Sequence, residues 1–221
     1  VAKQKINIEP NTIAAPKPTN QDGSVPANKT KIVKFDNKPF DGFVPTEPAD
    51  RDLLDNMQGS FVQEIVIKMI QKVLEVEAPI ETTRLARIIG NWCGLERVRQ
   101  ARMEELIGLI PRDQIEETGV GDFVWLNSDQ KKDWGVFRPE NPNSERDLDE
   151  IHPNEFVNSL LDTLQHARSL AREEATRLVA GIFGYSKLTA KVRTRIEQVL
   201  NRAVSEGSII LDAEDRYRLP S

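Results

Sequence analysis

Cysteine and histidine are among the scarcest residues in this 221-residue chain, which contains one of the former and two of the latter. A single thiol, Cys93, excludes an internal disulfide framework and suits a reducing compartment, so we expect a cytoplasmic protein. Two histidines without further sulfur ligands or an H-x-x-x-H spacing do not make a zinc site. His152, which precedes a proline, is expected at the start of a helix, and His166 on a helix surface. We therefore expect no metal and no other cofactor.

Long apolar runs and phosphate-binding loops are also missing. No run approaches the roughly 18 apolar residues that a membrane-spanning helix needs, and no P-loop pattern occurs. Cys93 stands beside Trp92 on an apolar helix face, a position typical of a buried structural thiol rather than a nucleophile. The acidic residues Asp147, Asp149 and Glu150 are expected to be solvated, as acidic connectors usually are. We predict neither a membrane contact nor enzymatic activity within this chain.

The overall charge is mildly negative. The formal net charge is -5, with 38% hydrophobic and 29% charged residues, which is typical of a globular protein. A negative balance argues against an electrostatic grip on nucleic acid by the whole surface. The chain starts at Val1 without an initiator methionine or a signal-peptide pattern, so we expect it to be part of a longer polypeptide.

Proline is concentrated at the beginning of the chain, where residues 1–60 hold seven of the thirteen prolines. Proline removes a backbone donor and biases the preceding residue away from the helical region, so we predict an extended arm, flexible over residues 1–30. Within the arm, residues 31–35 (KIVKF) alternate like one edge strand, and residues 50–58 are expected to form a short helix. Three apolar residues are placed to dock the arm on a neighbouring surface: Phe40, Phe43 and Val44.

Helical periodicity begins after the arm, and residues 61–126 are predicted to form a first unit. Ser60 is expected to cap the first helix, which Pro79 stops. A second helix ends at Gly94, and a third helix and a small hairpin follow. The apolar stripe of the first helix comprises Phe61, Ile65, Val66, Met69, Ile70, Val73 and Leu74.

Residues 153–221 are predicted to form a second unit of the same kind. Pro153 suits the first turn of its first helix, and Gly184 separates the next two helices as a left-handed C-cap. Two short strands around an acidic turn follow. A helix-turn-helix followed by a hairpin is the order of elements in a winged helix. The connector, residues 127–152, carries apolar residues that we expect to pack in the seam between the units: Trp134, Val136 and Phe137.

The two units align when the sequence is shifted by 90 residues. The shift lays Leu74 on Leu164, Arg87 on Arg177, and Gly94 on Gly184. Any two amphipathic three-helix segments align to some extent, but here the glycine turn agrees as well, and we interpret the pattern as duplication. We expect a mainly α fold with small β-hairpins: tandem winged helix-turn-helix units that follow an extended Pro-rich arm. Because each unit has fewer than 70 residues, the two are expected to pack on each other.

Four strings carry a resemblance to a known group of proteins: EVEAPIETTRLARIIGNWCGLERV (residues 75–98), FVWL (123–126), FRPEN (137–141) and DLDEIHPNEF (147–156). They resemble an uncharacterised domain at the C-terminal end of very large bacterial helicase-like polypeptides of superfamily 1. Many of those also carry a small endonuclease-like domain. The resemblance covers residues 56–219 and departs from the family at Ala78, where the family has glycine. It implies a context of nucleic-acid processing or defence and assigns no biochemical role to this domain.

Basic residues gather on the second unit. Residues 168–202 hold eight basic and three acidic residues, a net of +5 in a chain that is negative overall. In a helix-turn-helix the start of the last helix enters the major groove, so this helix is expected to contact nucleic acid. The candidates there are Lys187, Lys191, Arg193, Thr194 and Arg202. On the first unit the candidates are Arg97 and Arg99, accompanied by Arg84, Arg87 and Arg102 and diluted by Glu96, Glu104 and Glu105.

Two classes of function stay open. One is a non-catalytic module that binds nucleic acid, DNA rather than RNA, and positions a larger helicase- or nuclease-type protein on its substrate. The other is a structural or protein-docking module that contacts the parent polypeptide or a partner. A continuous positive stripe across both third helices would favour the first class, and an exposed apolar patch the second.

Overall fold

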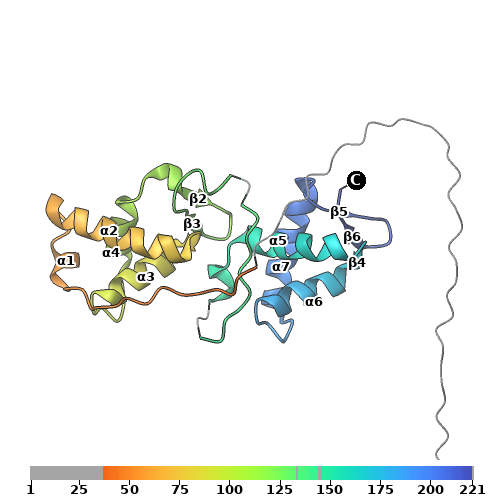
Figure 1. Ribbon diagram of the computed structural model, residues 1–221, viewed down its shortest axis with the longest axis horizontal. Helices are drawn as coiled ribbons and strands as arrows, with labels where there is room; N and C mark the ends of the chain where they lie inside the picture. The colour runs from red at the N-terminus through yellow and green to blue at the C-terminus, as the bar shows by residue number, and fades with distance from the viewer. Residues whose placement is uncertain (1–36, 133, 144–145, 221) are drawn as a thin grey trace, which may run out of the picture. The chain divides into compact units, whose positions relative to one another are not determined.

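The computed structural model describes residues 37–132, 134–143 and 146–220 (Figure 1). The predicted flexible segment 1–30 and the predicted edge strand 31–35 lie outside the described residues. About 49% of the described residues are helical and 9% are in strands, which confirms a mainly helical class with small antiparallel sheets. The described residues belong to one compact unit.

The first half of the fold, residues 52–126, places helices around a three-stranded sheet. Its elements in chain order are α1 (Asp52–Asp55), α2 (Ser60–Glu77), β1 (Ile80–Glu81), α3 (Thr82–Trp92), α4 (Gln100–Gly108), the 3₁₀ helix η1 (Arg112–Gln114), β2 (Ile115–Glu117) and β3 (Asp122–Val124). The strand order is β1-β3-β2. All pairs are antiparallel, with Val124 opposite both Ile80 and Ile115.

The second half, residues 148–219, repeats this order of elements. It comprises the 3₁₀ helix η2 (Leu148–Glu150), α5 (Pro153–His166), β4 (Leu170–Ala171), α6 (Arg172–Ile182), α7 (Ala190–Ser205), β5 (Ile210–Leu211) and β6 (Arg216–Arg218). The strand order is β4-β6-β5, which corresponds to β1-β3-β2 in the first half. Tyr217 lies opposite Leu170 and Leu211 in the antiparallel register.

Several elements recur at an offset of 90 residues: β1 and β4, α3 and α6, and the starts of α4 and α7. Gly94 and Gly184 follow α3 and α6 with φ angles of 73° and 82°, a left-handed conformation that favours glycine. After each glycine the next amide bonds back to a carbonyl inside the helix, at 2.8 and 2.9 Å, which completes a Schellman cap. The halves differ after that point, because α4 ends at Gly108 and η1 follows, whereas α7 continues to Ser205.

Each half has its own hydrophobic core. The first is built from α1 to α4 and β3, around residues such as Val66, Ile89 and Leu106. The second is built from α5, α6, α7 and β6, and the connector contributes Phe137 to it. Trp134, also from the connector, packs edge-on against the ring of Trp125, with the centroids 5.2 Å apart.

Two expectations for the first helix are wrong. Ser60 does not cap α2 but is its first residue, and Gly59 takes the N-cap position without a side-chain bond. Phe61, expected on the buried stripe, is 72% exposed. The buried positions of α2 begin only at Val66.

A strap, which we define as residues 37–49, runs from the connector to α1 (Figure 1). Phe40 is 1% exposed, and the ring of Phe43 lies 5.0 Å from that of Trp92. The predicted docking of these two phenylalanines is therefore confirmed, with the surface supplied by the chain itself. Val44 is 78% exposed and does not take part. The predicted helix over residues 50–58 is shorter than expected, at four residues in α1.

Candidate nucleic-acid interface

Two of the basic candidates on α7 are engaged by carboxylates near its start. The Nζ atom of Lys191 lies 2.7 Å from Oδ2 of Asp149, which comes from η2. Arg193 forms a double ion pair with Glu173 of α6, with Nη2 2.9 Å from Oε1. Hydrogen bonds from Arg193 and Arg177 lower the pKa of Glu173 to about 2, so this carboxylate stays charged at neutral pH. These cations have local counter-charges that sequence reasoning missed, because the partners are distant along the chain.

Arg202, in the last turns of α7, is engaged in the same way. Its Nε atom lies 2.7 Å from Oε1 of Glu206, and Nη1 donates to the carbonyl of Thr118 at 3.3 Å. Thr118 follows β2, so the hairpin of the first half reaches this part of α7. One side of the helix that was expected to face nucleic acid is therefore in contact with the chain itself.

Lys187 and Thr194 are the second-half candidates without such partners. Both are exposed, and neither side chain has a hydrogen bond or ion pair within the described residues. Lys187 lies before α7, where Thr189 is the N-cap residue and accepts a hydrogen bond from the Val192 amide at 3.3 Å. Of the five candidates on this half, only these two have side chains that are free to contact a ligand.

Arg97 and Arg99 lie in a different setting. Both are exposed and precede α4, whose N-cap residue is Arg99. Within the described residues neither guanidinium is paired with a carboxylate. They line a hollow of about 730 Å³ together with Arg51 and Arg102, and we call these four residues the arginine hollow.

Acidic groups reduce the charge of this hollow without cancelling it. Glu96 and Asp55 also line it, and Asp55 Oδ1 lies 2.8 Å from Nη2 of Arg102. Glu104, also expected to dilute the patch, does not line the hollow and accepts a hydrogen bond from Gln100 at 2.9 Å. The N-terminus of α4 adds a positive partial charge to the same place. Arg51 was not among the sequence candidates, because only the packing of α1 beside α4 brings it there.

Arg84 and Arg87, which accompanied the first-unit candidates, serve the fold instead. Arg84 is 8% exposed, with Nε 2.6 Å from Glu77 and Nη1 2.7 Å from Glu150. Arg87 Nη2 lies 2.6 Å from the other oxygen of Glu150. The expectation that Glu150 is solvated is therefore wrong: it is 8% exposed and completes a capping box with Asp147. Burial of a carboxylate is tolerated here because two guanidiniums satisfy it.

His152 is the N-cap residue of α5, as its position before Pro153 predicted. Its Nδ1 accepts a hydrogen bond from the Asn154 amide at 3.2 Å, and its Nε2 lies 3.6 Å from Oε2 of Glu116. Burial lowers the pKa of His152 although Glu116 opposes this effect. Because Nδ1 is an acceptor, the imidazole is neutral and its proton faces Glu116.

Cys93 is 1% exposed, and burial raises the pKa of its thiol to about 11. A thiol with such a pKa is protonated at neutral pH and is a poor nucleophile. Among the described residues, no group of three or more His, Cys, Asp or Glu side chains is arranged to hold a metal ion. None of the helices in the described part of the chain combines the length and apolarity needed to cross a bilayer.

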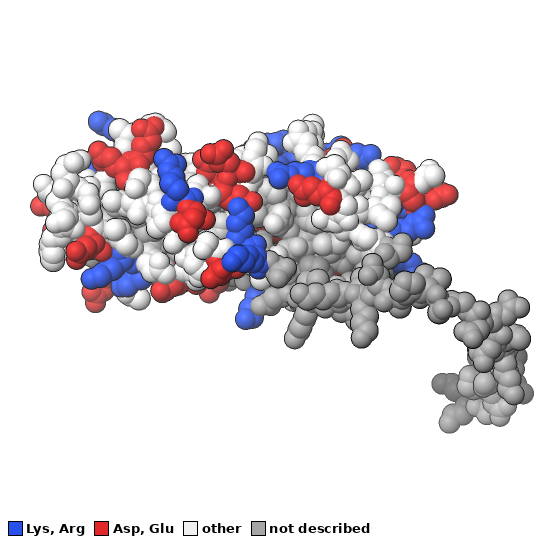
Figure 2. All heavy atoms as spheres, turned by 90° about the horizontal axis from the view of Figure 1, so that it is seen from above, with Lys and Arg blue, Asp and Glu red and all other residues white. Residues whose placement is uncertain are grey.

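The surface carries both signs of charge. Figure 2 shows Lys and Arg interspersed with Asp and Glu over the described residues of the face in view, without a continuous stripe of one sign. The arginine hollow is therefore a local feature. No protein-family model, curated protein or solved structure matches this chain.

Proposed function

We propose that the chain is a non-catalytic nucleic-acid-binding module made of two duplicated winged-helix units. The order helix, strand, helix, helix, strand, strand in each half supports the winged-helix assignment, as does the sheet order β1-β3-β2 and β4-β6-β5. The shared offset of 90 residues and the matching glycine caps support duplication. The resemblance to a C-terminal domain of helicase-like polypeptides extends the proposal to a helicase- or nuclease-type parent.

The arginine hollow carries the proposal. Arg97 and Arg99 are exposed, unpaired within the described residues, and located at the N-terminus of the third helix of the first unit. In a winged helix this is the position that meets the major groove or a backbone phosphate. DNA is favoured over RNA, because the deep and narrow major groove of A-form RNA does not admit a helix. Lys187, before α7, is the corresponding contact on the second unit.

The sequence predicted that the second unit supplies most of the contact with nucleic acid, and the charges in the structure favour the first unit. Lys191 and Arg193 already hold carboxylates, so binding a phosphate there requires a protein ion pair to be exchanged for a new one. Arg97 and Arg99 need no such exchange. We expect the first unit to supply most of the electrostatic contact.

Salt-dependent binding to labelled duplex and single-stranded DNA tests the proposal. The double variant Arg97→Glu/Arg99→Glu should bind duplex at least about tenfold more weakly at low salt. It should also flatten the slope of log K against log salt by about 0.9 for each lost contact. The matched control, Lys191→Glu/Arg193→Glu, changes the same number of charges and should have a smaller effect. The proposal is contradicted if the unmutated chain binds neither probe. It is also contradicted if the Arg97→Glu/Arg99→Glu variant binds as well as the unmutated chain.

Protein docking is the second candidate and has its own supporting observation. Phe61 is 72% exposed on the first turn of α2, which is unusual for a large aromatic side chain. Contact with the parent polypeptide or a partner would cover it. If DNA contact is the function, Phe61→Ser should leave DNA binding unchanged. If docking is the function, the same variant of the full-length polypeptide should no longer bind its partner.

A further inference from the structure

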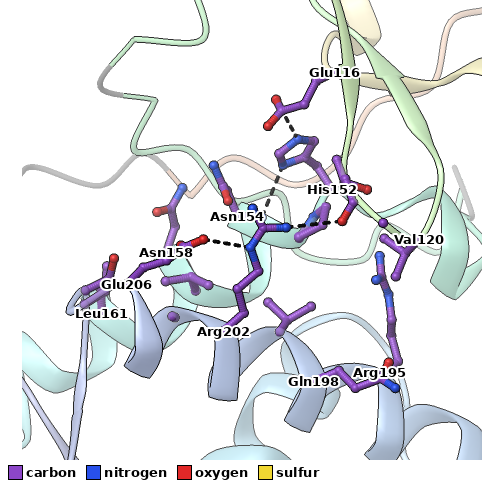
Figure 3. A pocket seen from close by; sticks show the side chains of 17 residues that line it. Glu116, Val120, His152, Asn154, Asn158, Leu161, Arg195, Gln198, Arg202 and Glu206 are labelled. Atoms are coloured by element: carbon purple, nitrogen blue, oxygen red, sulfur yellow. Dashed lines mark hydrogen bonds and ion pairs between the residues drawn. The ribbon is translucent and has the colours of Figure 1, made fainter.

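A groove of about 450 Å³ lies between the β2–β3 hairpin and helices α5 and α7 (Figure 3). It is distinct from the arginine hollow and shares none of its residues. Its apolar lining comes mainly from the two helices and comprises Val120, Pro153, Val157, Leu161, Val199 and Ala203. The remaining lining is polar and includes Arg195 and Arg202.

Arg195 is an unusual member of this lining. It is 5% exposed, and its Nε and Nη1 atoms have no hydrogen-bond partner in the described chain. Within the described residues, the guanidinium makes one hydrogen bond, from Nη2 to the carbonyl of Ile151, at a long 3.4 Å. Burial lowers the pKa of this guanidinium, although the charge of Asp149 opposes the effect. Buried polar groups usually have hydrogen-bond partners, so a buried guanidinium with two unused donors can bind an acceptor atom of a ligand.

The other buried arginines make the contrast plain. Arg84 bonds the carboxylates of Glu77 and Glu150, and Arg138 bonds that of Glu155. Arg195 forms no ion pair with any carboxylate in the described residues. Figure 3 shows that it extends from α7 toward Val120, at the tip of the hairpin, along one side of the groove.

The rest of the rim limits the kind of anion that fits. Arg202 is held by Glu206 and by the carbonyl of Thr118, and Glu116 faces His152 (Figure 3). The two rim carboxylates, Glu116 and Glu206, repel a polyanion such as a nucleic-acid backbone. A single carboxylate matches the single charge of Arg195, and the apolar wall favours a hydrocarbon body.

We propose that this groove binds a small molecule with one carboxylate group and an apolar body. The carboxylate accepts a charge-assisted hydrogen bond from a free N–H of Arg195, at Nε or at Nη1, which lie on opposite edges of the guanidinium. The hydrocarbon part lies against Val157, Leu161 and Val199. This inference is independent of nucleic-acid binding.

Hexanoate and its neutral counterpart hexanamide test the site on the full chain by ¹H–¹⁵N NMR titration. Hexanoate should shift the amide signals of residues 118–121 and of Asn154, and should bind at least about tenfold more tightly than hexanamide, because hydrogen bonds to charged groups are the stronger ones. Arg195→Met should remove this preference. Arg177→Met, which alters an exposed arginine on α6, should not.

A second variant keeps the proposal testable if Arg195→Met fails to fold. Gln198 is exposed and lines the groove, so Gln198→Glu adds a negative charge with almost no change in shape. It should weaken hexanoate several-fold and leave hexanamide unchanged. Equal affinity of the parent chain for hexanoate and hexanamide would overturn the proposal. So would inorganic phosphate that competes with hexanoate at equal affinity, because the apolar wall would then contribute nothing.

Discussion

Arg138 of the connector and Glu155 of α5 form a buried ion pair, in which Nη2 lies 2.7 Å from Oε1. Glu155 is fully buried, and Arg146 is a second partner, with Nη1 2.6 Å from the same oxygen. Burial raises the pKa of Glu155, but the two guanidiniums outweigh burial and lower it to about 2. Arg138 also donates to the carbonyls of Glu77 and Pro79, at 2.7 and 3.1 Å, so one side chain joins both halves of the fold.

Removal of Arg138 should uncouple the two halves. Arg138→Met leaves Glu155 with one of its two cations and two backbone carbonyls of the first half without a donor. Breaking a buried pair in this way costs about 3–5 kcal/mol. Calorimetry should show one transition for the parent chain and two for the variant. The control is Arg177→Met, whose side chain is 68% exposed, and a single unshifted transition in Arg138→Met would contradict the coupling role.

Phe40 should be a main anchor of the strap. Its ring lies among three guanidinium groups, with centroid distances of 5.1 Å to Arg84, 5.3 Å to Arg138 and 4.1 Å to Arg146. Phe40→Ala removes a buried aromatic and these cation–π contacts, so we expect a loss of about 3–5 kcal/mol in urea unfolding. Phe40→Leu should lose less.

Deletion of the arm before the strap provides the comparison for the loss of stability in Phe40→Ala. Deletion of residues 1–30, whose prolines disfavour a core, should leave the melting temperature nearly unchanged. A deletion as harmful as Phe40→Ala would show that the sequence assignment of the arm is wrong.

Stability should fall as the pH drops below about 6.5. The folded pKa of His152 lies below its ordinary value of 6.5, so the unfolded chain binds more protons in this range. The free energy of unfolding then decreases by up to about 1.4 kcal/mol for each pH unit. Hydrogen bonds from His152 and from Nε1 of Trp125, the latter at 2.8 Å, lower the pKa of Glu116 to about 2 against the effect of burial.

His152→Asn removes the titrating imidazole but keeps the N-cap hydrogen bond, because the asparagine side chain can accept it. The variant therefore isolates the contribution of His152 to the pH dependence. Chemical denaturation at several pH values should show that the variant loses less stability than the parent between pH 7 and pH 5. Below about pH 4.5 both chains should lose stability, since Glu155 has an ordinary pKa of 4.5 and a folded pKa of about 2. Identical profiles above pH 5 would rule out His152 as the source.

Gly90 should not tolerate a side chain. A Cβ atom there would lie 2.3 Å from Cγ2 of Val98, so Gly90→Ala forces α3 and the following loop apart. We expect a loss of about 1–3 kcal/mol, the usual cost of overpacking. A Cβ atom on Gly181, in α6, would meet no atom within 4 Å, so Gly181→Ala should be neutral or stabilise by up to about 1 kcal/mol. The double variant Gly90→Ala/Val98→Ala should recover part of the loss, which a double-mutant cycle measures.

Local rules determined much of the fold from the sequence alone. The apolar periodicity located α2, α3, α5, α6 and α7, because a helix that covers a core repeats its buried positions every three or four residues. Gly94 and Gly184 marked helix ends, since a left-handed residue after a helix is most often glycine. Pro153 marked the start of α5 for a comparable backbone reason. These features depend on a residue and its near neighbours, so they can be read along the chain.

Only the tertiary structure decided which charges are available. Lys191 meets Asp149 from 42 positions away, and Arg84 meets Glu150 from 66 positions away, whereas Arg195 meets no carboxylate in the described residues. The sequence does not distinguish these cations, because the periodicity of apolar and polar positions is the same whether or not a charged side chain has a partner. The partner is set by the way distant segments pack, and packing also decides how strongly water screens the charge.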